Sequence, residues 1–214
     1  MKNLKLRLVM YFVGLFIMAL GVSISVKSNL GVSPVSSIPY TMTCVWGIEM
    51  GKATILFHTA LVVLQIILLR QAFQVKNLLQ VIIGIVFGYY TTFCNWCMTF
   101  LPTPEHIVIR LAMMLFSTFI IALGLFFYVP ADIMPLAGEG AMQTISQLTG
   151  IPFAKVKVAF DVSMVTISLI VCLVALHGLG SVGAGTVIAA VLVGTILGYL
   201  TKVLGPWRNQ LLQK

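Results

Sequence analysis

A lysine and an aspartate, Lys157 and Asp161, lie four residues apart inside a long run of apolar residues. Residues at this spacing share one face of a helix, so their side chains can form an ion pair. An ionised carboxylate in apolar surroundings is costly unless a partner or water compensates it. Two interpretations follow: a structural ion pair that holds helices together, or a polar site that faces a solute pathway.

A second carboxylate, Glu139, lies between Gly138 and Gly140 at the start of a predicted short helix. The unpaired N–H groups at a helix start stabilise a carboxylate, so helix capping explains this residue. The flanking glycines also let a substrate approach closely, which favours ligand binding. A carboxyl group in a low-dielectric site can titrate near neutral pH, so Glu139 and Asp161 are candidate proton carriers.

Cys94 and Cys97 form a C-x-x-C motif, the spacing of redox pairs and of half a zinc site. No second such motif or nearby histidine pair completes four ligands, and ordinary buried thiols are the favoured explanation of the spacing. The motifs of P-loop proteins, zinc proteases and α/β-hydrolases are absent. We therefore expect no enzyme activity, no cofactor and no metal, with a role for the two thiols left open.

The chain around these residues has the composition of a membrane protein. Of its 214 residues, 60% are apolar and 8% are charged, against about 25% charged residues in soluble domains. The net charge of +8 comes from lysines and arginines scattered at the ends of apolar runs, as membrane topology and lipid headgroups favour. Because no basic stripe exists, we exclude nucleic acid as a partner and predict the lipid bilayer.

Six apolar segments are long enough, or nearly so, to cross about 30 Å of hydrocarbon as helices. They lie near residues 8–26, 53–69, 79–101, 107–129, 156–176 and 186–204. Two shorter segments, near 35–48 and 138–150, hold about 13 helix-compatible residues each, which is too short for a span. The sequence predicts an all-α, polytopic membrane protein with two short helices.

The two halves of the chain repeat one pattern. A shift of 103 positions places residues 16–21 on 119–124 without a gap, and a further shift of seven places residues 84–89 on 194–199. We infer an internal duplication, with residues 1–104 as the first repeat and 105–214 as the second. The pairs Gly84/Gly88 and Gly194/Gly198 are one helical turn apart, which predicts faces where helices pack closely.

The number of spans in each repeat decides how the copies are related. If the short helices are re-entrant, each repeat has three spans and the second copy is inverted, as in many secondary transporters. If they cross, each repeat has four spans and the copies are parallel. Both arrangements put ten lysines and arginines inside and three outside, so charge does not choose. We predict two inverted repeats, with parallel four-span repeats as the alternative, and both termini in the cytoplasm.

The duplication also pairs residues of the two halves. His58 falls on Asp161 and Asn29 falls on Asp132 under the 103-residue shift. In an inverted duplication, equivalent positions lie symmetrically about one axis, so His58 and Asp161 are candidates to line a central cavity. Asn29 and Asp132 are candidates to cap the ends of the long helices that precede them.

Interrupted segments at matching places in two halves indicate a transporter binding site. The first of these links holds Ser33 and Pro34, and the second leads to Gly138. We predict a substrate or ion pathway lined by Glu139, Asp161, Lys157, His58, Asn29 and Ser33, with Pro34, Gly138 and Gly140 shaping the backbone beside it.

Several motifs resemble the YitT/YczE family of bacterial multi-pass membrane proteins. They are Leu30-Gly31-Val32-Ser33-Pro34, Gly138-Glu139-Gly140-Ala141, residues 150–161 and Gly183-x-Gly185-Thr186. Val35-Ser36 stands where YczE-type members often carry Trp-Asp, so no role is transferred to these two positions. The resemblance covers nearly the whole chain and implies a bacterial plasma-membrane protein, while it supplies little about function.

These observations favour a transporter or channel for a small molecule or ion, in which one repeat rocks against the other. Without an ATPase motif, energy would come from an ion gradient or a separate subunit. The alternative is a non-transporting accessory protein that assists a biosynthetic or export system. A membrane-embedded enzyme ranks third, because no set of nucleophile, base and metal ligands is present. The substrate and a homo-oligomeric state are left open.

Overall fold

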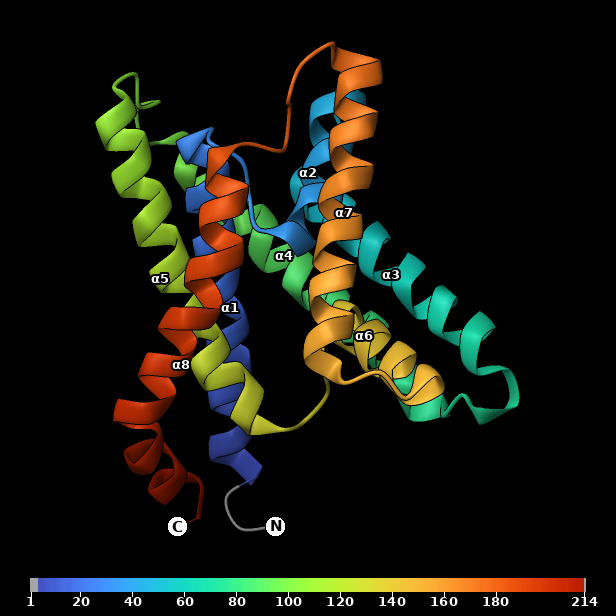
Figure 1. Ribbon diagram of the computed structural model, residues 1–214. Coiled ribbons are helices and arrows are strands. Elements are labelled where there is room, and N and C mark those ends of the chain that lie inside the picture. Colours follow the sequence, from blue (N-terminus) through green and yellow to red (C-terminus); the bar gives the residue numbers. More distant parts are fainter. Residues whose placement is uncertain (1–3, 214) are drawn as a thin grey trace.

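The computed structural model describes residues 4–213; Lys2 and Lys214, two lysines predicted on the cytoplasmic side, lie outside the described residues. The described part is helical throughout and contains no strand. Its elements are α1 (Leu4–Ser28), α2 (Pro34–Trp46), α3 (Met50–Leu69), η1 (Arg70–Ala72), η2 (Val75–Leu78), α4 (Leu79–Thr99), α5 (Ile107–Ala131), α6 (Ala137–Thr149), α7 (Phe153–Leu176) and α8 (Ala184–Gln213), as Figure 1 shows.

Within residues 4–213, six helices are long and apolar enough to cross a membrane: α1, α3, α4, α5, α7 and α8. The helices α2 and α6 have 13 residues each, or about 20 Å of length, which is too short to cross about 30 Å of hydrocarbon. The prediction of an all-α, multi-pass protein is therefore confirmed. The inverted relation of the repeats stays a prediction.

Residues with left-handed backbone end the first and second helices of each repeat. Asn29, after α1, has φ 52°, and Asp132, after α5, has φ 49°. Asn and Asp are the non-glycine residues that adopt this conformation most readily. Gly47 and Gly150 end the short helices at φ 66° and 69°, where the missing Cβ avoids a clash. These turns let the chain reverse twice within each repeat.

The long helices α1 and α5 run antiparallel and form the most extensively packed helix pair of the described residues, here called the central pair. The Arg7 guanidinium near the start of α1 donates to the Ala131 carbonyl at the end of α5, at 2.9 Å. The Arg110 guanidinium near the start of α5 donates to the Ser28 carbonyl at the end of α1, at 2.8 Å, and also to the Asn29 carbonyl. Cations at these carbonyls stabilise the negative ends of both helices.

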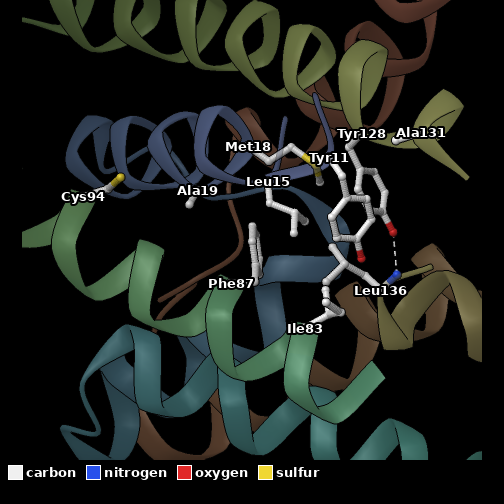
Figure 2. Close-up of a cluster of buried hydrophobic side chains, with 10 residues drawn as sticks. All are labelled: Tyr11, Leu15, Met18, Ala19, Ile83, Phe87, Cys94, Tyr128, Ala131 and Leu136. Atoms are coloured by element: carbon white, nitrogen blue, oxygen red, sulfur yellow. Dashed lines mark hydrogen bonds between the residues drawn. The ribbon is translucent and has the colours of Figure 1, made fainter. Parts of the chain in front are cut away.

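The other helices form two groups beside this central pair. In one, α4 and α8 pack against α1 and α5; in the other, α2 packs against α7 and α3 packs against α6. Figure 2 shows the apolar cluster that joins α1, α4 and α5, in which Tyr11, Leu15 and Phe87 are buried. Helix α3 also packs against α4 and connects the two groups, whereas α7 and α8 do not pack in this way.

Candidate functional site

A central cavity of about 500 Å³ lies between the two groups of helices. This volume is within the range of small-molecule sites, about 300–1,000 Å³. Each of the eight α-helices contributes to its walls, and most of the lining side chains are apolar. Its polar lining residues are Ser33, Ser36, Thr54, His58, Glu139, Gln143, Lys157 and Asp161.

The starts of the two short helices meet at this cavity. A methyl group on Gly138 of α6 would lie 3.4 Å from Cγ1 of Val35 on α2. The side chain of Ser33, the N-cap residue of α2, does not cap the backbone N–H groups of the helix and donates to the Ser36 hydroxyl at 3.0 Å. Free N–H groups at helix starts attract anionic or polar groups. The cavity is therefore bordered by two positive helix ends.

A tyrosine fixes the carboxylate of Glu139 in the first turn of α6. The Tyr128 hydroxyl donates to Oε2 of Glu139 at 2.7 Å and accepts the backbone N–H of Leu136. Figure 2 shows Tyr128 beside Tyr11 with both hydroxyl groups pointing toward Leu136, and Tyr11 donates to the Met134 carbonyl at 2.7 Å. The two tyrosines thus hold the link between α5 and α6 against α1.

The predicted ion pair is present on α7. Nζ of Lys157 lies 2.6 Å from Oδ2 of Asp161, with the lysine side chain 50% exposed and the aspartate side chain 17% exposed. The second carboxylate oxygen, Oδ1 of Asp161, is buried and has no hydrogen-bond partner within the described protein. One oxygen of this carboxylate is therefore left for another group.

His58 occupies the equivalent place on α3 and is only 2% exposed. Its ring lies edge-on between Phe57 and Phe87, with centroid distances of 5.8 and 5.9 Å. Its Nδ1 has no hydrogen-bond partner within the described protein. Gly84 of α4 packs directly against it, since a methyl group there would lie 2.8 Å from Cβ of His58.

Seven of the nine predicted site residues line the cavity: Ser33, Pro34, His58, Gly138, Glu139, Lys157 and Asp161. Asn29 does not, because it is exposed at the end of α1, where its carbonyl accepts from Arg110. Gly140 does not either, because it lies against the Gln80 amide of α4.

Sequence reasoning missed the polar partners of these residues. Tyr128 resembles any other aromatic residue of an apolar helix, and no spacing connects it with Glu139. Gln65 and Gln80 are 1% and 2% exposed, and the Gln65 amide donates to Gln80 at 2.9 Å and to the Ala137 carbonyl at 3.2 Å. Two glutamines inside apolar segments were a usable signal, since buried amides need partners.

One prediction about helix packing is wrong. Gly84 and Gly88 lie against α3, as expected, but nothing lies within 4 Å of a Cβ placed on Gly194 or Gly198. Gly194 instead lines the cavity. The glycine face of α8 therefore has no close neighbour in the described chain.

The four cysteines are free thiols, with Cys94 and Cys172 buried and Cys44 and Cys97 partly buried. Cys172 lies within 3.7 Å of the Thr41 hydroxyl. No group of three or more His, Cys, Asp or Glu side chains in residues 4–213 is arranged to hold a metal ion.

Comparison with known proteins gives a family without an assigned activity. Residues 5–202 match the "Family of unknown function (DUF6198)". The chain is 26% identical over 200 residues to "Uncharacterized membrane protein YczE" of Bacillus subtilis (strain 168), which covers 92% of this chain and 86% of that protein. No solved structure matches.

Proposed function

This chain belongs to the DUF6198 family, and we propose that it is a membrane transporter or channel for a small solute. The observation that carries this proposal is the central cavity of about 500 Å³, where ionisable side chains from both halves face apolar walls. Ionisable groups inside a membrane are costly and usually mark the path of a solute or ion. The starts of two interrupted helices at the same place support a binding site there.

The second part of the proposal is that the repeats are inverted relative to each other. Carbon atoms added at Gly14 and Gly124 would each lie 2.8 Å from the carbonyl oxygen of the other residue. A carbon on Gly21 would lie 3.1 Å from the Ser117 carbonyl oxygen. Under the 103-residue shift, residue 14 corresponds to residue 117 and residue 124 corresponds to residue 21. The contact 14/124 is therefore equivalent to the contact 21/117, as a two-fold axis between α1 and α5 requires. The same shift converts the hydrogen bond between Arg7 and Ala131 into the hydrogen bond between Arg110 and Ser28.

This arrangement gives the molecule a proposed orientation in the membrane. The start of α1 and the end of α8 lie together at the lower end of Figure 1, and the links from α3 to α4 and from α6 to α7 lie in its lower half. We assign this end to the cytoplasm, with α6 re-entering from it and α2 from the opposite side. Impermeant thiol reagents should then label Gln74→Cys and Leu179→Cys, both at exposed positions, from opposite sides.

The polar groups have distinct proposed roles. Asp161 offers its unpaired oxygen to the solute while Lys157 compensates its charge. Glu139, held by Tyr128, contacts the solute or carries a coupled proton. The apolar walls exclude water, so these few contacts orient the solute.

Cysteine accessibility tests this function. In a background without the four native cysteines, Ser33→Cys is expected to react with a small hydrophilic reagent, because Ser33 lines the cavity. Val174 is 75% exposed on the side of α7 that we expect to face lipid. Val174→Cys is the control and should not react. A mixture of cell metabolites should slow the reaction of Ser33→Cys, and Glu139→Gln should remove that protection. An inert Ser33→Cys in a correctly folded protein would contradict transport and favour an accessory role.

A further inference from the structure

Helices α3 and α4 close one wall of the cavity through the glycine face of α4. A methyl group on Gly84 would lie 2.8 Å from Cβ of His58, and one on Gly88 would lie 2.8 Å from the Gly51 carbonyl oxygen. At the start of α3, the Thr92 hydroxyl donates to the Glu49 carboxylate at 3.0 and 3.1 Å. No room for a solute remains between these two helices.

The same face on α8 is open. Under the two sequence shifts, Gly194 corresponds to Gly84 and Gly198 to Gly88, while Asp161 of α7 corresponds to His58. Nothing lies within 4 Å of a Cβ on either glycine of α8, and both Gly194 and Asp161 line the cavity. Glycine weakens a helix relative to alanine. It is useful where another backbone must approach closely.

We propose that α7 closes on α8 in a second state, in which Gly194 and Gly198 pack against α7 as Gly84 and Gly88 pack against α3. In that state α3 and α4 separate, so that access to the cavity changes from one face of the membrane to the other. The structure is then the state open between α7 and α8. This inference rests on the proposed function, because only solute transport requires both states.

The lining of the two helix pairs explains why α7 and α8 are apart here. Between α3 and α4 the facing group is an imidazole, which aromatic rings enclose. On α7 it is Asp161, which is ionically paired on one oxygen and unpaired on the other. Enclosing an incompletely paired carboxylate is unfavourable. The other ionisable groups that line the cavity are His58, Glu139 and Lys157. A solute group that satisfies Asp161 removes the obstacle to closure.

Two equivalent cysteine pairs measure the positions of these helices. Glu49→Cys with Thr92→Cys reports the α3–α4 contact. Pro152→Cys with Lys202→Cys is its equivalent under the two shifts and reports contact between α7 and α8. Both Pro152 and Lys202 are exposed, so substitution there should leave the fold intact. The full-length protein without its native cysteines carries one pair at a time and is reconstituted in liposomes. Each pair is then treated with a short bifunctional cross-linker that reacts with thiols.

The first pair should cross-link in most molecules and the second in a minority. Asp161→Asn should raise cross-linking of the second pair at least threefold and lower that of the first. If the second pair fails to cross-link even with Asp161→Asn, the closure of α7 on α8 is wrong, while metabolite protection of Ser33→Cys would still support transport. Cross-links between two copies carrying Lys202→Cys alone would also overturn the inference, because a second copy would then cover α8.

Discussion

The two halves of this protein differ most in the helix pair that follows each short helix. In the first repeat, 39% of the residues in an 18-residue apolar stretch are buried inside the protein, for the spans of both α3 and α4. In the second, the values are 22% for α7 and 11% for α8. Both pairs carry the same glycine spacing, so the glycines alone do not determine the arrangement. The facing side chains differ: His58 on α3, and Asp161 with Lys157 on α7. The two helix pairs thus differ in arrangement, and in our proposal the charge of Asp161 accounts for that difference.

The central pair α1 and α5 shows the opposite behaviour. Arg7 and Arg110 make the same contacts from opposite ends, with N–O distances of 2.9 and 2.8 Å. Buried side chains such as Tyr11 and Tyr128 pack between the two helices, with ring centroids 5.2 Å apart. The two halves therefore match along α1 and α5 and differ in the flanking helices, which is consistent with our proposal that the flanking helices move.

The largest expected effect comes from enlarging equivalent glycines in the two halves. Gly84→Leu should destabilise the protein by about 3 kcal/mol or more, because the new side chain overlaps His58 and overpacks a filled interface. Gly194→Leu should leave stability unchanged, since nothing lies within 4 Å of its Cβ. Thermal unfolding in detergent measures both. Equal destabilisation by the two substitutions would remove the contrast between the repeats.

A smaller effect is expected at the central pair, where the halves agree. Arg7→Ala and Arg110→Ala should each cost about 2 kcal/mol, because each removes charge-assisted hydrogen bonds to helix-end carbonyls. The additional contact of Arg7 with Asp132, at 3.6 Å, adds little because the aspartate side chain is 91% exposed. Thermal unfolding of both variants should give matching shifts. A large difference between them would argue against equivalent repeats.

The ion pair on α7 should have the smallest effect on stability. Lys157→Met leaves Asp161 without its cation and should cost about 1–2 kcal/mol, less than for a fully buried pair because the lysine is half exposed. Adding Asp161→Leu should restore the stability that Lys157→Met removes, since no unpaired charge remains. The double variant should fold but show no metabolite protection of Ser33→Cys. Full protection in the double variant would assign the pair a structural role alone.

The helical elements could be predicted because length and apolar composition determine them. Segments of about 20 apolar residues span a bilayer, and segments of about 13 do not. The candidate site could also be predicted, because the inferred duplication and the interrupted helices indicate that Glu139, Asp161 and His58 lie near each other in three dimensions. These signals depend on chain pattern and need no knowledge of tertiary contacts.

The contacts that support the site could not be predicted in the same way. Glu49 at a segment end is consistent with solvation by lipid headgroups, yet its side chain accepts from the Gly51 N–H at 2.8 Å and caps α3. The hydrogen bond from Tyr128 to Glu139 depends on how the α5–α6 link folds back. The spacing of Gly194 and Gly198 predicts a close contact that the structure does not contain, because spacing alone does not indicate whether another helix lies opposite.

We propose that the two halves enclose a pathway with alternating access, in which the cavity opens first to one side of the membrane and then to the other. This proposal is tested most directly by labelling Ser33→Cys with an impermeant hydrophilic reagent in right-side-out and inside-out vesicles. We predict faster labelling from the cytoplasmic side, because in our proposal the cavity opens between α7 and α8 toward that side. Asp161→Asn should shift labelling toward the external side by at least threefold. Labelling that is equal from both sides and unchanged by Asp161→Asn would contradict the account.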